Sequence, residues 1–254
     1  MMHSTFSKKI LEQTAAVGLW LAVWHIASII IGVDMILPSP IIVAQRLASL
    51  IATKGFWESI AFSMSRMGAG FILALVVSIA LAALSYVFRF AEILLSPAMS
   101  VIKAAPVASY IVLCLLLMPS RRLSIVISFM MALPVFYSNI LEGLRQTDPK
   151  LLEMARTYEI PLYKRIAFIY FSHVLPYLTA AISVALGLCW KAGIAAEVIG
   201  IPRGSIGESF YQAKIYSDTK SVLAWTIVVV AFSLLFEKAF LLLLAQIRHS
   251  LERR

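Results

Sequence analysis

Apolar runs of about twenty residues recur along the whole chain, with short polar segments between them. A helix of that length crosses the hydrocarbon core of a bilayer. Six runs therefore predict membrane-spanning helices, at about residues 14–33, 60–87, 92–117, 123–143, 174–200 and 221–246. No polar block is long enough for a second domain, so the sequence predicts one all-α, multispan membrane domain over residues 1–254.

The first apolar run, TAAVGLWLAVWHIASIIIGV, follows Lys8 and Lys9, as the apolar core of a signal peptide would. It is too long for such a core and lacks a small-residue cleavage site, so we expect a retained first span. His25 lies inside it; a hydrogen-bonded packing role is the simpler interpretation, with a proton-relay role as the alternative.

Composition agrees with the hydrophobic pattern. The chain is 61% hydrophobic with a mean hydropathy of +0.90, against about 45–50% apolar residues in soluble domains. Cys114 and Cys189 lie in apolar runs without CxxC or Cys/His spacing. We therefore expect them to be packing residues and predict neither a disulfide framework nor a metal site.

The distribution of positive charge predicts the orientation, because cytoplasmic loops carry the excess of Lys and Arg. Six spans place both termini on one side. The eleven basic residues of that side are Lys8, Lys9, Arg89, Arg145, Lys150, Arg156, Lys164, Arg165, Arg248, Arg253 and Arg254. The seven of the other side are Arg46, Lys54, Arg121, Arg122, Arg203, Lys214 and Lys220. This predicts cytoplasmic termini, although the Arg121–Arg122 pair fits poorly outside. No aromatic-interleaved basic stripe suggests nucleic-acid binding.

Between the first two spans, LPSPIIVAQRLASLIATKGFW combines two prolines with a short apolar periodicity. This pattern predicts an amphipathic helix on the outer surface that ends at Gly55.

The segment TDPKLLEMARTYEIPLYKR, residues 147–165, carries seven charged side chains in an otherwise apolar chain. Asp148 followed by Pro149 predicts a helix start, and Pro161 predicts that the helix ends at Ile160. Such a helix is too short to span a membrane and is marginal alone in water. Its apolar face could pack on the chain's own bundle or dock on a partner; that face comprises Leu151, Met154, Ala155 and Tyr158.

The stretch LLEMARTYE, with Leu175 and Pro176 downstream, resembles the EAA loop of membrane subunits of binding-protein-dependent ABC importers. The resemblance is to the branch for nitrate, sulfonate, taurine and thiamine precursors. Glu153 and Ala155 match the first and third letters of the motif. The segments that also resemble this branch are LPSP at 37–40, SRMGAGF at 65–71, LPVFYSNILEGLRQTDPKLLEMAR at 133–156 and LPYLTAAISVALGLCWKAGIAAEVIG at 175–200.

The chain departs from the family motif at two places. Glu159 occupies the position of a glycine, and Phe171 with Ser172 occupies the position of the usual Leu-Pro pair. The bend after the short helix therefore cannot be predicted from the resemblance.

The resemblance implies a type I importer fold in the bacterial plasma membrane, with two copies of this subunit lining one path. Each copy would offer its helix to a cytoplasmic ATPase and receive solute from an extracytoplasmic binding protein. The residues expected to couple to the ATPase are Asp148, Pro149, Leu151, Glu153, Met154, Ala155, Arg156 and Tyr158. No G-x-x-x-x-G-K-[ST] pattern occurs. We therefore expect the partner ATPase to bind ATP and magnesium, and this chain to be neither an enzyme nor a cofactor carrier.

Charged residues inside the apolar runs are costly and need a partner or an aqueous path. The most costly of them are Lys103, Lys191, Glu197, Glu237 and Lys238. Arg66, close to the outer end of its span, is expected to extend its charge to the membrane interface. A straight third span from residue 92 places Lys103 about 16 Å in, near the midplane. Lys103, Lys191 and Glu197 could line a path for small anions, or the lysines could pair with Glu197 between helices. Glu237 and Lys238 are expected in packing or dimer contacts.

Two other classes fit less well. A secondary transporter or channel would favour two matching halves and carboxylates near the midplane; no half-to-half similarity is found and few carboxylates lie within the spans. A membrane hydrolase would need a motif such as H-E-x-x-H, which does not occur, or a nucleophile elbow. GSIG at 204–207 lacks the first glycine of that elbow, where Arg203 stands. The identity of the transported solute is not predicted, because the binding protein mainly selects it.

Overall fold

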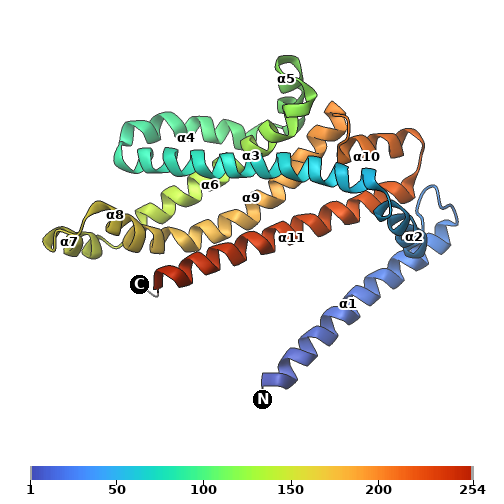
Figure 1. Ribbon diagram of the computed structural model, residues 1–254, viewed down its shortest axis with the longest axis horizontal. Coiled ribbons are helices and arrows are strands. Elements are labelled where there is room, and N and C mark those ends of the chain that lie inside the picture. Colours follow the sequence, from blue (N-terminus) through green and yellow to red (C-terminus); the bar gives the residue numbers. More distant parts are fainter. Residues whose placement is uncertain (1, 253–254) are drawn as a thin grey trace. The chain divides into compact units, whose positions relative to one another are not determined.

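The computed structural model describes the backbone of residues 2–252 and the side chains of residue 12 and residues 14–246. All regular structure in this part of the chain is helical (Figure 1). The helices are α1 (Met2–Ile31), α2 (Pro40–Ile51), α3 (Lys54–Val87), α4 (Arg89–Ala104), α5 (Val107–Leu117), α6 (Ser120–Arg145), α7 (Pro149–Thr157), α8 (Leu162–Lys164), the π-helix η1 (Arg165–Tyr170), α9 (Phe171–Gly200), α10 (Ile206–Ile215) and α11 (Thr219–Glu252).

Five helical segments are long and apolar enough to span a membrane, and a sixth candidate is bent. The five are Thr14–Ile31, Lys54–Val87, Ser120–Arg145, Leu162–Gly200 and Thr219–Gln246. They lie where five of the six predicted spans were placed. The all-α, multispan fold class predicted from the apolar pattern is thus confirmed.

The predicted third span, 92–117, is not one straight helix. Its two halves, α4 and α5, meet at a bend of 103°. Pro106 explains the break, because a proline pushes the residue before it out of the helical region. Ala105 is accordingly extended, with φ −75° and ψ 143°. The Tyr110 hydroxyl donates to the Val101 carbonyl at 3.1 Å across the bend.

The chain forms two compact units. One comprises the chain up to Glu58 together with Ser209–Val228, and the other comprises Ser59–Glu208 together with the chain from Val229 onward. The boundaries pass through helices α3, α10 and α11, so neither unit is a separate stretch of sequence. The single-domain organisation therefore stays a prediction.

In the first unit, the predicted amphipathic helix is α2. Ser39 caps it by accepting from the Ile42 amide, and Pro40 is its first residue. The helix ends at Ile51, before the predicted end, where the Ala52 and Thr53 amides turn back to the Leu50 carbonyl. Gly55 instead lies in the first turn of α3. Trp24 Nε1 donates to the Pro38 carbonyl at 3.1 Å, which ties the entry of α2 to α1.

In the second unit, the core lies between α6 and α9, which make the most extensive helix contact. Gly193 allows α9 to come close to its neighbours: a Cβ there would lie 2.8 Å from Met67 Cγ and 2.9 Å from Ser128 Oγ. Hydroxyl groups complete the helix contacts, as where Ser78 donates to the Leu133 carbonyl at 2.9 Å. Small residues and buried hydroxyls are the usual means of packing helices in a membrane.

Candidate functional site

The short polar helix forms as the sequence predicts at its start. Asp148 is the N-cap of α7, where its carboxylate accepts from the Lys150 amide at 2.9 Å, and Pro149 is the first helical residue. These two residues satisfy or remove amide donors that a helix start leaves unpaired.

The end of α7 differs from the predicted one. The helix ends at Thr157 rather than Ile160, and Glu159 follows with φ +49° in the left-handed region. The Ile160 amide donates to the Ala155 carbonyl at 2.9 Å and the Glu159 amide to the Arg156 carbonyl at 3.0 Å. This pair of bonds is the Schellman motif, which normally has glycine at the left-handed position. The bend after α7 thus keeps the backbone geometry of a glycine turn with glutamate in its place.

The side chains of α7 divide between the inside and the outside of the chain. Ala155 has 0% exposed surface, since α7 packs against η1. Leu151 is half-buried, whereas Met154 is 43% and Tyr158 76% exposed. The residues predicted to couple to a partner are therefore not all exposed on the outside of the chain. Glu153 and Arg156, also predicted to couple, are exposed.

Exposed apolar side chains continue beyond α7. Leu162 and Tyr163 of α8 are largely exposed. Together with Met154 and Tyr158 they form what we term the α7 surface. Large apolar side chains gathered on an exposed polar segment mark an interaction site. Unlike the apolar surface of the long helices, Met154 and Tyr158 belong to a helix, or to its end, that is too short to span a bilayer. Leu162 and Tyr163 lie at the start of the candidate span Leu162–Gly200.

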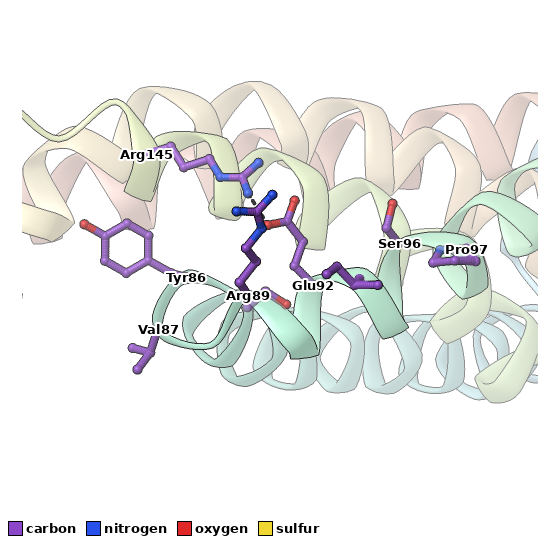
Figure 2. Close-up of a pocket in the computed structure, with 9 residues that line it drawn as sticks. Tyr86, Val87, Arg89, Glu92, Ser96, Pro97 and Arg145 are labelled. Atoms are coloured by element: carbon purple, nitrogen blue, oxygen red, sulfur yellow. Dashed lines mark hydrogen bonds and ion pairs between the residues drawn. The ribbon is translucent and has the colours of Figure 1, made fainter.

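A cleft of about 720 Å³ lies near the residues that lead into α7. Figure 2 shows its side chains, among which Arg89, Glu92 and Arg145 converge. Arg145, the last residue of α6, forms an ion pair with Glu92 in the first turn of α4. The pair thus joins α4 to the segment that continues into α7. Periodicity could not reveal this pair, because its members come from different helices and are far apart in sequence.

The charged residues inside the spans have different surroundings. Lys103 is exposed and donates to Ser138 Oγ at 3.2 Å, and Lys191 is also exposed. Glu197 is fully buried. The predicted alternative of a Lys103–Glu197 pair is therefore wrong, because Lys103 ends near the bend after α4 and reaches Ser138 on α6 instead.

Hydrogen bonds from within the chain hold Glu197. Its Oε2 accepts from Ser63 Oγ at 2.6 Å and from the Gly207 amide at 3.3 Å. Ser63 Oγ in turn accepts from the Ile206 amide at 2.9 Å. The carboxylate thus fastens the start of α10 to α3 and α9. A role in lining a path stays a prediction for the two exposed lysines.

The apolar spans, the broken pair α4–α5 and the short capped helix between α6 and α9 together define a multispan membrane permease. The chain belongs to the family described as binding-protein-dependent transport system inner membrane component, which matches residues 70–249. Within it, the chain is an ABC importer permease of the nitrate and sulfonate branch. The resemblance seen in the sequence is thereby confirmed.

Several curated relatives are similar over most of the chain. The putative aliphatic sulfonates transport permease protein SsuC of Bacillus subtilis (strain 168) is 25% identical over 212 residues, which cover 82% of this chain and 76% of the relative. The nitrate import permease protein NrtB of Synechocystis sp. is 26% identical over 224 residues, covering 84% and 80%. The bicarbonate transport system permease protein CmpB of Synechococcus elongatus is 28% identical over 169 residues, covering 64% and 60%.

Proposed function

We propose that this chain is the transmembrane subunit of an ATP-driven importer and forms the path for a small anion delivered by a substrate-binding protein. The names of the relatives support an anionic solute, since sulfonates, nitrate and bicarbonate are all small oxyanions. Two copies would form the path, because one copy supplies one docking helix and a two-fold assembly engages two ATPase subunits.

The observation that carries the proposal is the α7 surface. Its helix is capped and packed at its base, so the exposed side chains of Met154 and Tyr158 are held in place rather than free to fold inward. A groove on a cytoplasmic ATPase that covers them would remove apolar surface from water. ATP and magnesium would be bound by that partner.

The exposed lysines support a positively lined path. Lys103 lies beside Ser138, about 8 Å from the middle of α6 by the helical rise. It carries its charge into the apolar segment with a hydroxyl as its hydrogen-bond partner. Such a lysine in a span is expected to face an aqueous path or another subunit rather than lipid.

The test replaces Tyr158, which is 76% exposed. In Tyr158→Ala, loss of an aromatic anchor should weaken ATPase binding about tenfold or more. The ATPase should then fail to copurify after mild detergent extraction, and ATP-driven uptake of nitrate, bicarbonate or an aliphatic sulfonate into vesicles should fall. Tyr216→Ala is the matched control, because Tyr216 is 80% exposed in a different segment.

Two outcomes would contradict the proposal: a wild-type chain that purifies without an ATPase and still transports, as a secondary transporter would, or equal uptake by Tyr158→Ala and the wild type. Ala155→Asp is a poorer test, because Ala155 is buried within its own chain. That change would damage folding before it reached any partner.

A further inference from the structure

A second open pocket lies at the opposite end of the α6–α9 pair from α7. It has a volume of about 690 Å³ and is lined by Ser120, Arg121, Ile201, Pro202, Arg203 and Gly204. Here α6 begins and α9 ends; a Cβ on Gly200 would lie 2.8 Å from Leu123 Cδ2, which shows how closely the two helices approach. Helix α6 has 26 residues and separates this pocket from the α7 end by about 39 Å at 1.5 Å per residue.

The pocket carries an excess of positive charge. Arg121 and Arg203 line it, and Arg66 donates from Nη1 to the Arg121 carbonyl. The guanidinium carbons of Arg66 and Arg121 lie 3.9 Å and 5.7 Å from the centre of the Phe62 ring. Within the described side chains, none of these three arginines forms an ion pair. The charges of Arg66 and Arg121, which both lie near the same ring, repel each other unless an anion joins them.

The acidic groups nearby are already engaged. Glu208 Oε2 accepts from the Gly204 amide at 2.6 Å on the pocket wall. Glu197 is buried and accepts from Ser63 and Gly207. Both carboxylates thus hold the loop that forms the wall and leave the guanidinium groups of Arg121 and Arg203 free to bind a ligand.

The wall of the pocket is held in an unusual backbone conformation. Ile201 has φ +46°, although a β-branched residue rarely adopts the left-handed region, and Gly204 has φ +79°. The hydrogen bonds of Ile206 and Gly207 to Ser63 and Glu197 fix the next residues. Strain that the surroundings enforce is typical of functional sites, and a wall fixed in advance lowers the entropy lost on binding.

The positive charge of this pocket also runs against the usual distribution of Lys and Arg across a membrane. If the α7 end is cytoplasmic, Arg121 and Arg203 lie on the outer side, where Lys and Arg are less common in membrane proteins. A function that needs positive charge outside would explain their presence.

We propose that this pocket binds a small oxyanion at the outer end of the permease, before it enters the path. The guanidinium groups of Arg121 and Arg203 would donate to its oxygens, since their planar forks match two oxygens of a sulfonate, nitrate or bicarbonate. The Ser120 hydroxyl would add a third donor. The direction of transport rests on the proposed function, whereas binding of the anion does not. A concave site favours a small anion over an acidic surface of the binding protein, which would need a broader contact.

The first experiment measures binding without transport. The permease, copurified with its partners and placed in nanodiscs, is treated with phenylglyoxal, which modifies arginine, and the modified peptides are quantified by mass spectrometry. Nitrate, bicarbonate or ethanesulfonate should slow modification of Arg121 and Arg203 relative to chloride at equal ionic strength. Arg122 is the internal control, because it is exposed on the same segment but does not line the pocket.

The second experiment measures transport with saturating loaded binding protein. Arg121→Gln and Arg203→Gln should each lower maximal anion uptake about tenfold, the loss expected for one charge-assisted hydrogen bond. The binding-protein concentration that half-maximally stimulates ATP hydrolysis should stay unchanged. Arg121→Lys and Arg203→Lys should keep part of the uptake, and Arg122→Gln should match the wild type.

Equal phenylglyoxal modification with and without the oxyanions would overturn the inference. A shift in half-maximal binding-protein concentration without anion protection would overturn it too, and would assign the arginines to protein docking. If the wild type shows anion protection but no ATP-driven uptake, the proposed function fails while the anion site stands.

Discussion

Glu159 occupies a backbone conformation that glycine adopts at lower cost. Its φ of +49° places Cβ close to the following carbonyl. We expect Glu159→Gly to stabilise the protein by about 1 kcal/mol, because glycine removes that strain at the end of α7. Glu159→Val should destabilise it, because a β-branched residue fits this conformation worst. Thermal unfolding of the wild type and the two variants in the same detergent compares their stabilities. A melting temperature of Glu159→Gly below that of the wild type would contradict the assigned turn.

Ser63 connects the buried carboxylate to the start of α10. Ser63→Ala removes the donor to Glu197 and the acceptor of the Ile206 amide, and leaves both groups buried without these partners. Each loss should cost about 1–3 kcal/mol, and hydrogen exchange of the Ile206 amide should accelerate. Ser65→Ala is the control, because Ser65 is exposed and donates only to Phe62 of its own helix. Equal stability of the two variants would show that the cluster does not hold the loop.

At the scale of single residues, the sequence predicts the features that depend on residues close to one another in the chain. Asp148 and Pro149 identify the start of α7, because capping involves residues only a few positions apart. The partners of Glu197 could not be predicted in the same way. Ser63 is 134 positions from it, and nothing local distinguishes that serine from the others in the same helix.

At the scale of elements, the contribution of the ion pair between α4 and α6 to stability can be predicted and measured. The side chains of Arg145 and Glu92 are 45% and 29% exposed. A partly exposed pair is worth about 0–1 kcal/mol after solvent screening. A double-mutant cycle with Glu92→Gln and Arg145→Gln should therefore give a coupling free energy of unfolding within that range. The more exposed Lys54–Glu58 pair serves as the reference; a coupling well above about 2 kcal/mol would mean that the pair is shielded in the assembled transporter.

The broken third span shows what hydropathy can and cannot predict. Residues 92–117 are apolar enough for one span, and α4 and α5 together are indeed long and apolar enough to cross a membrane. Their direction changes because Pro106 makes Ala105 extended. The prolines of other spans lie inside continuous helices, as Pro134 does in α6 and Pro176 in α9. A proline in an apolar run therefore signals a possible break, but neighbouring helices decide whether it occurs.

At the scale of the whole molecule, function depends on which end of the α6–α9 pair faces the cytoplasm. The excess of Lys and Arg predicts that the α7 end does. The α7 surface could then meet an ATPase, and the arginine pocket at the other end could meet the anion. Coupling through α7 and the outer position of the anion site both need this one orientation, so a topology experiment tests their common premise.

Cysteine labelling in intact cells can determine it. Arg122→Cys places an exposed thiol in the first turn of α6, and Thr157→Cys places one at the last residue of α7. We expect a membrane-impermeant maleimide to label Arg122→Cys in intact cells and Thr157→Cys only after permeabilisation. The parent chain controls for Cys114 and Cys189, the second of which is buried. Labelling of Thr157→Cys in intact cells would place α7 outside, where no ATPase could bind it, and coupling through this helix would be excluded.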